Sequence, residues 1–129
     1  MVHFQFILIF VTIAAAACDA PANLVRLAPP ARVDSVAFEI SAIGGAGAGP
    51  ASLVYGVAVV RCDETVFWTI VSDGTRSLPQ RFTYGGALPG FETRAGPLPL
   101  LPGCYDILVS RARPLRFDIG ADGSATARP

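Results

Sequence analysis

Residues 53–62 read LVYGVAVVRC, the stretch of this 129-residue chain that is most typical of a β-strand. Its valines favour extended backbone, because β-branched side chains pack well on a pleated surface. Both faces of the strand would be apolar, which is typical of a strand in the interior of a sheet. We therefore predict a central strand here, and the flanking segments have to supply its neighbours.

The flanking segments show further strand patterns separated by short turns. Residues 33–43 alternate, with Val36, Phe38 and Ile40 on one face, and residues 66–71 (VFWTIV) are β-branched and aromatic. Shorter alternating runs occupy residues 81–84, 104–110 and 115–119, and residues 122–129 form either a short edge strand or a disordered tail. Six or seven short strands without a convincing helix predict an all-β fold, a small antiparallel β-sandwich over residues 33–129.

The longest irregular stretch is residues 85–103, GGALPGFETRAGPLPLLPG. A connection of this length in a compact domain is usually functional or tied down. Its apolar side chains either form a partner-binding patch or pack over the open end of the sandwich; they are Phe91, Leu98, Leu100 and Leu101.

The sequence LLPGCYDILVS at residues 100–110 resembles the end of transthyretin-like and carboxypeptidase-regulatory-like sandwich modules. The resemblance covers about ten residues and is carried by Pro102, Gly103 and Tyr105. It implies that Pro-Gly makes a turn and that the tyrosine enters the core of an immunoglobulin- or transthyretin-like sandwich. Such modules are generally binding or spacer units.

The N-terminal residues 1–17 read MVHFQFILIFVTIAAAA and precede Cys18. An apolar run of this length before small residues is the pattern of a secretory signal, and it is shorter than the roughly 20 residues of a typical membrane-spanning helix. The AAAC at residues 15–18 resembles a bacterial lipoprotein signal, which implies cleavage before Cys18 and lipidation of that cysteine. A plain signal peptide and a retained short anchor stay open as alternatives.

Each reading of the N-terminal segment predicts an exported protein, and the lipid or a retained helix predicts membrane anchoring on the extracytoplasmic side. Residues 18–32 are rich in proline and alanine, and we predict that they form a tether between the membrane and the domain. Cys62 and Cys104 then remain to form one disulfide, worth roughly 4 kcal/mol for a loop of about 40 residues. Two separate buried thiols are the alternative.

The composition limits the chemistry. The formal net charge is zero, which argues against a nucleic-acid partner. His3 is the only histidine and there is no lysine, so the exported part has no residues for a Ser-His-Asp triad, a histidine-ligated metal or a Schiff base. Residues 118–123 lack the closing glutamate of a calcium loop. We expect no cofactor, no metal and no enzyme; the alternative is an acid–base pair of carboxylates drawn from Asp63, Glu64, Glu92, Asp106 and Asp118.

Two groups of side chains are candidates for binding. Arg111, Arg113 and Arg116 would either dock an acidic partner or lipid headgroups, or form a solvated turn. Trp68, Tyr55 and Tyr84 are candidates for the platform of an alternative function, a small-ligand or carbohydrate-binding module, which requires at least one of these rings to be exposed on a concave surface. The leading hypothesis is a non-enzymatic, membrane-tethered envelope protein that acts through protein–protein contacts, for example as an accessory or stabilising subunit of a membrane complex.

Overall fold

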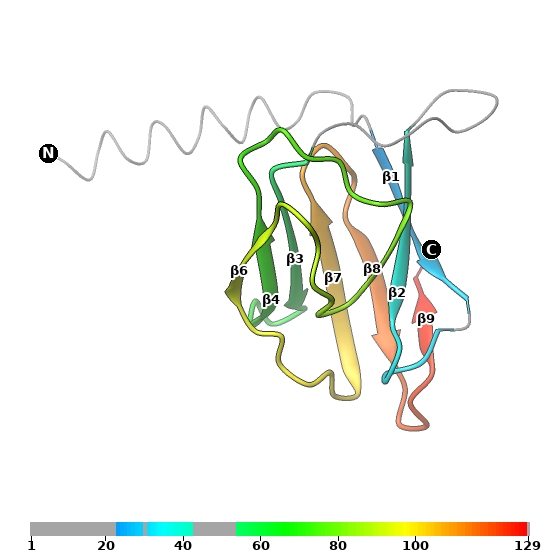
Figure 1. Cartoon of the computed structure of the whole chain (residues 1–129). Helices are drawn as coiled ribbons and strands as arrows, with labels where there is room; N and C mark the ends of the chain where they lie inside the picture. Colours follow the sequence, from blue (N-terminus) through cyan, green and yellow to red (C-terminus); the bar gives the residue numbers. More distant parts are fainter. Residues whose placement is uncertain (1–22, 30, 43–53, 129) are drawn as a thin grey trace, which may run out of the picture.

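The computed structural model describes residues 23–29, 31–42 and 54–128, which form strands, turns and loops without a helix. The strands are β1 (Asn23–Ala28), β2 (Ala37–Ala42), β3 (Gly56–Arg61), β4 (Val66–Val71), β5 (Arg81–Thr83), β6 (Glu92–Ala95), β7 (Gly103–Val109), β8 (Leu115–Ile119) and β9 (Ala125–Ala127). They form two antiparallel sheets, β1-β2-β5 and β6-β4-β3-β7-β8-β9 (Figure 1). The prediction of an all-β, sandwich-like fold is confirmed.

Strand β3 lies inside the larger sheet, between β4 and β7, as its apolar sequence predicted. Its side chains alternate: Val57 and Val59 are buried in the core, whereas Ala58 and Val60 lie on the opposite face and are only half-buried. A register shift between Val59 and Val60 marks a bulge against β4. The second apolar face of this strand is thus not covered by the smaller sheet.

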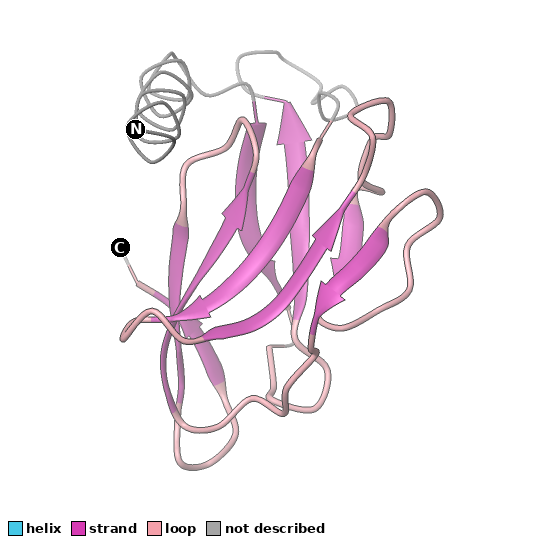
Figure 2. Ribbon diagram, turned by 90° about the vertical axis from the view of Figure 1, so that its left-hand side faces the viewer, coloured by secondary structure: helices cyan, strands magenta, loops and turns pink. Residues whose placement is uncertain are grey.

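Figure 2 shows the strands of the two sheets from a second side, and aromatic side chains join these sheets. Phe38 of β2 packs against Phe117 of β8, with ring centroids 5.6 Å apart, and against Phe82 of β5 at the same distance. Tyr105 of β7 stacks on Phe117 and is fully buried, as the resemblance at residues 100–110 implied. Burying these rings supplies much of the hydrophobic stabilisation of a small domain.

Strand β1 corrects the prediction of a tether over residues 18–32. Residues 23–28 pair one for one with β2, and Val25 and Ala28 are buried. The tether prediction is wrong for this segment, because NLVRLA is a short strand whose alternation is hidden between flanking prolines. Residues 18–22 lie outside the described part of the chain.

Two other short strands lie at the edges of the larger sheet. β6 occupies part of the stretch 85–103 that was predicted to be irregular, and none of its four residues is buried, so its sequence carries no hydrophobic pattern. β9 confirms the edge-strand interpretation of the C-terminal tail. With β1 these strands raise the number in the described residues to nine, above the predicted six or seven.

We call the two ends of the sandwich the upper end and the lower end, and define each by the strands that begin or end there. At the upper end β1 begins and β7 ends, and the backbone N–H of Asn23 donates to the carbonyl of Arg111 at 2.9 Å (Figure 1). At the lower end β3 ends and β7 begins, and the N–H of Cys62 donates to the carbonyl of Cys104 at 2.9 Å. Across the described ranges, no helix has the length and apolar character needed to cross a bilayer; the predicted signal or anchor at residues 1–17 lies outside them.

Candidate contact surfaces on the larger sheet

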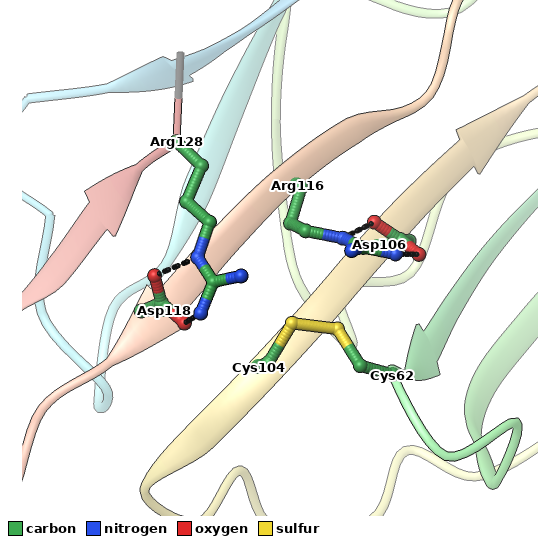
Figure 3. A network of polar contacts seen from close by, with 6 residues as sticks. All are labelled: Cys62, Cys104, Asp106, Arg116, Asp118 and Arg128. Carbon is green, nitrogen blue, oxygen red and sulfur yellow. Dashed lines mark hydrogen bonds and ion pairs between the residues drawn. A yellow bond between two sulfur atoms is a disulfide. The ribbon is translucent and has the colours of Figure 1, made fainter.

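The lower half of the outer face of the larger sheet is held by a disulfide. Cys62, just after β3, is bonded to Cys104 at the start of β7, with Cα atoms 5.4 Å apart and a sequence separation of 42 (Figure 3). The two strands are already hydrogen-bonded neighbours in the sheet, so the disulfide links adjacent strands at the lower end. The predicted pairing of the two cysteines is confirmed.

Two arginine–aspartate ion pairs lie beside the disulfide in the lower half of this face (Figure 3). Arg116 of β8 donates from Nε and Nη2 to the two carboxylate oxygens of Asp106 at 2.9 and 3.0 Å. Arg128 donates in the same two-pronged way to Asp118, at 2.6 and 2.9 Å. The hydrogen bonds from Arg116 lower the pKa of the Asp106 carboxyl below its ordinary value, because they stabilise the charged form. Figure 3 shows all six side chains gathered on neighbouring strands.

The upper half of the same face is apolar. A shallow groove of about 300 Å³ runs across β4, β3 and β7, and its lining includes Gly56, Ala58, Thr69, Val71 and Leu108. Leu108 is 40% exposed at its edge. The small side chains on β3 leave the hollow, and the larger ones on β4 and β7 form its walls. We name this surface the apolar groove.

The loop predicted to form a partner-binding patch is split by the fold. Leu100 is buried in the core, and Phe91 is half-buried and packs against it. Leu98 and Leu101 are 45% and 52% exposed. The hydroxyl of Tyr105 ties this loop down, since it accepts from the N–H of Leu101 at 2.9 Å and donates to its carbonyl at 2.7 Å. Two of the four side chains thus face solvent and two cover the core.

The three arginines considered as one cluster divide in the same way. Arg116 is paired with Asp106 on the sheet face, whereas Arg111 and Arg113 are exposed in the turn between β7 and β8. Neither of the turn arginines has a carboxylate within 4 Å among the described residues. Arg111 has a left-handed backbone with φ of 64°, a conformation that glycine adopts more easily. The structure therefore leaves two of these guanidinium groups open to solvent at the upper end.

The three aromatic residues considered as a ligand platform differ in exposure. Trp68 is fully buried, and Tyr84 is half-buried with its hydroxyl donating to the carbonyls of Leu98 and Phe67. Burial raises the pKa of Tyr84 to about 12, since the charged phenolate is disfavoured there. Tyr55 alone presents its ring, with 61% of the residue exposed. It directly precedes Gly56, one of the lining residues of the apolar groove.

Of the carboxylates considered for catalysis, Asp63 and Glu64 lie in the turn after β3 and Glu92 starts β6, whereas Asp106 and Asp118 lie on the neighbouring strands β7 and β8 and are each paired with an arginine. Three aspartates in turns share one local hydrogen-bond pattern. Asp63, Asp73 and Asp122 each accept a hydrogen bond from the backbone N–H two residues ahead, within turns. These turn hydrogen bonds, with those from the Thr65, Thr75 and Ser124 hydroxyls, lower the pKa of the three carboxyls. Within residues 23–29, 31–42 and 54–128 no three His, Cys, Asp or Glu side chains gather as metal ligands would.

The apolar groove is the feature that the sequence analysis missed. The pattern that could have found it is the apolar second face of residues 53–62 together with Leu108, which alternates out of phase with the core residues of β7. Cys18, the predicted lipidation site, lies outside the described residues. Comparison of the chain with protein-family models, with curated proteins and with solved structures gave no match in any of the three.

Proposed function

We propose that this protein is a non-enzymatic envelope protein, tethered to a membrane through lipidated Cys18 and acting by contact with another protein. An accessory or stabilising subunit of a membrane complex is the concrete form we favour. The AAAC sequence at residues 15–18 supports export and lipidation. The sandwich belongs, on this proposal, with the transthyretin-like and carboxypeptidase-regulatory-like modules, which generally bind or space other domains.

The observation that carries the proposal is the exposed apolar half of the larger sheet. Leu108 of β7 presents a large apolar side chain to solvent directly across from Ala58 of β3, and Thr69 and Val71 of β4 line the other side of the groove. A contiguous apolar surface of this kind on a soluble domain is typical of a protein contact site. The groove is shallow and open, so a partner with a complementary surface can cover this part of the sheet.

The experiment uses the full chain produced in a host that processes lipoproteins, extracted from membranes in a mild detergent. We expect the protein to elute as part of a larger complex of fixed composition. Leu108→Arg places a charge at the edge of the apolar groove and should dissociate that complex. Thr126→Arg is the matched control, because Thr126 is exposed on β9 of the same sheet, away from the groove.

The contact proposal fails if the wild-type protein is monomeric after gentle extraction, or if Leu108→Arg and Thr126→Arg leave the complex equally intact. A folding defect is distinguished by circular dichroism, which should be the same for both variants and the wild type. Each of these outcomes bears on the partner contact and leaves the lipid tether to be judged from the mass of the protein.

A second candidate function is binding of a small ligand or carbohydrate. It is favoured by the exposed ring of Tyr55, which lies at the end of the apolar groove next to Gly56. An exposed tyrosine ring can stack on the apolar face of a sugar. This function predicts saturable binding of a soluble oligosaccharide in calorimetry, abolished in Tyr55→Ala and retained in Tyr84→Phe; binding that is the same in both variants would exclude Tyr55 as the platform.

A further inference from the structure

The loops at the two ends of the sandwich carry opposite charge. The upper loops after β4 and β7 contain three arginines, Arg76, Arg111 and Arg113, and one acidic residue, Asp73. The lower turns contain one arginine and four acidic residues, which are Arg32, Asp34, Asp63, Glu64 and Asp122. Residues 43–53, which connect β2 to β3, carry no charged side chain. The described domain is therefore polarised along its strands, with a basic upper end.

The charges next to this basic end do not cancel it. Glu92, which starts β6 beside the end of β4, is paired with Arg94 at 3.5 Å. Asp73 is hydrogen-bonded within its own turn, to the N–H and hydroxyl of Thr75, and its carboxylate interacts electrostatically with Arg76, so it offsets one of the three arginines. Arg111 and Arg113 have no carboxylate within 4 Å among the described residues. Two guanidinium groups are thus available to bind an anion at this end.

The loops of the basic end are connected to one another by hydrogen bonds. The N–H of Tyr55 donates to the hydroxyl of Ser110 at 2.8 Å, and the N–H of Ser72 donates to the carbonyl of Tyr55 at 2.8 Å. The N–H of Val54 donates to the carbonyl of Arg76 at 2.9 Å. These bonds hold the exposed Tyr55 ring between the loop that bears Arg76 and the turn that bears the other two arginines.

The N-terminal segment leads to this same end. The N–H of Asn23 donates to the carbonyl of Arg111 at 2.9 Å, and Asn23 also forms a bridge with Ala112. Five peptide units separate Cys18 from Asn23, so a lipid on Cys18 would keep Asn23 within roughly 17 Å of the bilayer even if the intervening chain were fully extended. A tether of this length allows the basic end to approach charged headgroups to within about 10 Å, the Debye length at 0.1 M salt, where their attraction is not fully screened.

We propose that the upper end of the sandwich is a membrane-docking surface for anionic phospholipid headgroups, with Arg111 and Arg113 as the principal contacts, Arg76 as a third and Tyr55 as an interfacial aromatic. Arginine donates two parallel hydrogen bonds to a phosphate, and tyrosine is enriched at the interface between membrane and water. Docking would direct the lower end and its acidic turns away from the bilayer. It would also hold the sheet face that carries the apolar groove perpendicular to the membrane, where a partner can reach it. The inference rests on the proposed lipid tether.

The experiment uses the full, processed protein in lipid nanodiscs made of phosphatidylcholine alone or with phosphatidylglycerol. A spin label on a minor lipid broadens the amide NMR signals of residues close to the headgroups. We expect phosphatidylglycerol to increase the broadening at residues 72–76 and 110–114 and to leave residues 62–65 and 120–124 unchanged. Raising the salt to about 0.5 M should reverse the effect, since screening weakens exposed charges.

The decisive variant is Arg111→Asn with Arg113→Gln, in which asparagine is chosen because it tolerates a left-handed backbone. Each arginine near an anionic surface contributes about 1 kcal/mol, so the double variant should weaken docking roughly 30-fold. The matched control is Arg26→Gln with Arg32→Gln, which removes the same charge away from the upper end and should preserve the lipid-dependent broadening.

Three outcomes would overturn the inference. Broadening that does not depend on phosphatidylglycerol, or that the two double variants reduce equally, shows a tethered domain with no docking surface. Protection of residues 110–114 that appears only with an acidic partner protein and never with lipid assigns the arginines to that partner. A protein that separates from the nanodiscs in high salt has no lipid tether, and that result removes the proposed function together with the docking.

Discussion

The lower and upper halves of one sheet face are built in different ways. Strand β7 passes through both: in its first part Cys104 is covalently linked and Asp106 is paired with Arg116, and in its second part Leu108 faces solvent beside the apolar groove. The opposite face of the same strand is uniformly buried, with Tyr105, Ile107 and Val109 in the core. The fold is therefore stabilised by the core and by the lower half, and the upper half is free to serve binding.

The largest loss of stability should come from removing the disulfide of the lower half. Cys62→Ser with Cys104→Ser opens a loop whose ends have a sequence separation of 42, and the chain-entropy model gives a loss of about 4 kcal/mol in the free energy of unfolding. Urea unfolding of the double variant, with the reduced wild type as a control, measures it. A loss below about 1 kcal/mol would show that the disulfide contributes little to the stability of this half.

The second-largest loss of stability should come from releasing the loop that the Tyr105 hydroxyl holds at the lower end. Tyr105→Phe removes the hydroxyl that bonds to both backbone groups of Leu101, and leaving them unpaired should cost about 1–3 kcal/mol. Amide exchange of residues 98–102 should accelerate at the same time. Tyr55→Phe is the matched control: its ring is exposed, so we expect a change within about 0.5 kcal/mol. Equal effects of the two variants would contradict the contrast between the ends.

The ion pairs should make the lower half sensitive to acid. Arg116 lowers the pKa of Asp106 in the folded state, so this carboxyl stabilises the fold at neutral pH. The stabilisation is present above the ordinary aspartate pKa of about 3.9 and is lost as the pH falls through the lower folded-state value. Wild type should therefore be more stable than Asp106→Asn at pH 6, and the difference should shrink steadily as the pH falls below about 3.9. A difference that does not change with pH would contradict the assigned pairing.

The smallest effect on stability should come from the apolar groove itself. Leu108→Ser replaces a side chain that is 40% exposed, and we expect a change within about 0.5 kcal/mol. Ile107→Ala, one residue away on the buried face, should cost about 2–5 kcal/mol. Urea unfolding of both variants compares the two faces directly. A large loss in Leu108→Ser would mean that the groove is part of the stabilising core and no site for a partner.

The parts of the fold that the sequence predicts are those with strong alternation. Val36, Phe38 and Ile40 are buried on one face as expected, and β3 is an inner strand. Strands β1 and β6 were missed because their patterns are short and β6 has no buried residue. Only pairing with β2 and β4 makes them strands, and such long-range pairing is not encoded in local sequence.

The candidate surfaces were less predictable than the fold. The disulfide follows from the count of cysteines, but the split of the arginines depends on which face each one occupies: Arg116 meets Asp106 across the strands, whereas Arg111 and Arg113 stand in a turn. The loop leucines divide because Leu100 faces the core and its neighbour Leu101 faces solvent. Both divisions are set by tertiary packing.

The central claim is that a disulfide-closed sandwich is held at a membrane by a lipid on Cys18. Intact mass spectrometry of the protein extracted from membranes tests it most directly. The account predicts a chain that begins at Cys18, carries the mass of the added lipid, and is two protons lighter than the reduced form because Cys62 and Cys104 are bonded. A mass that includes residues 1–17, or a mature chain without acyl groups, would contradict the tether and the docking that depends on it.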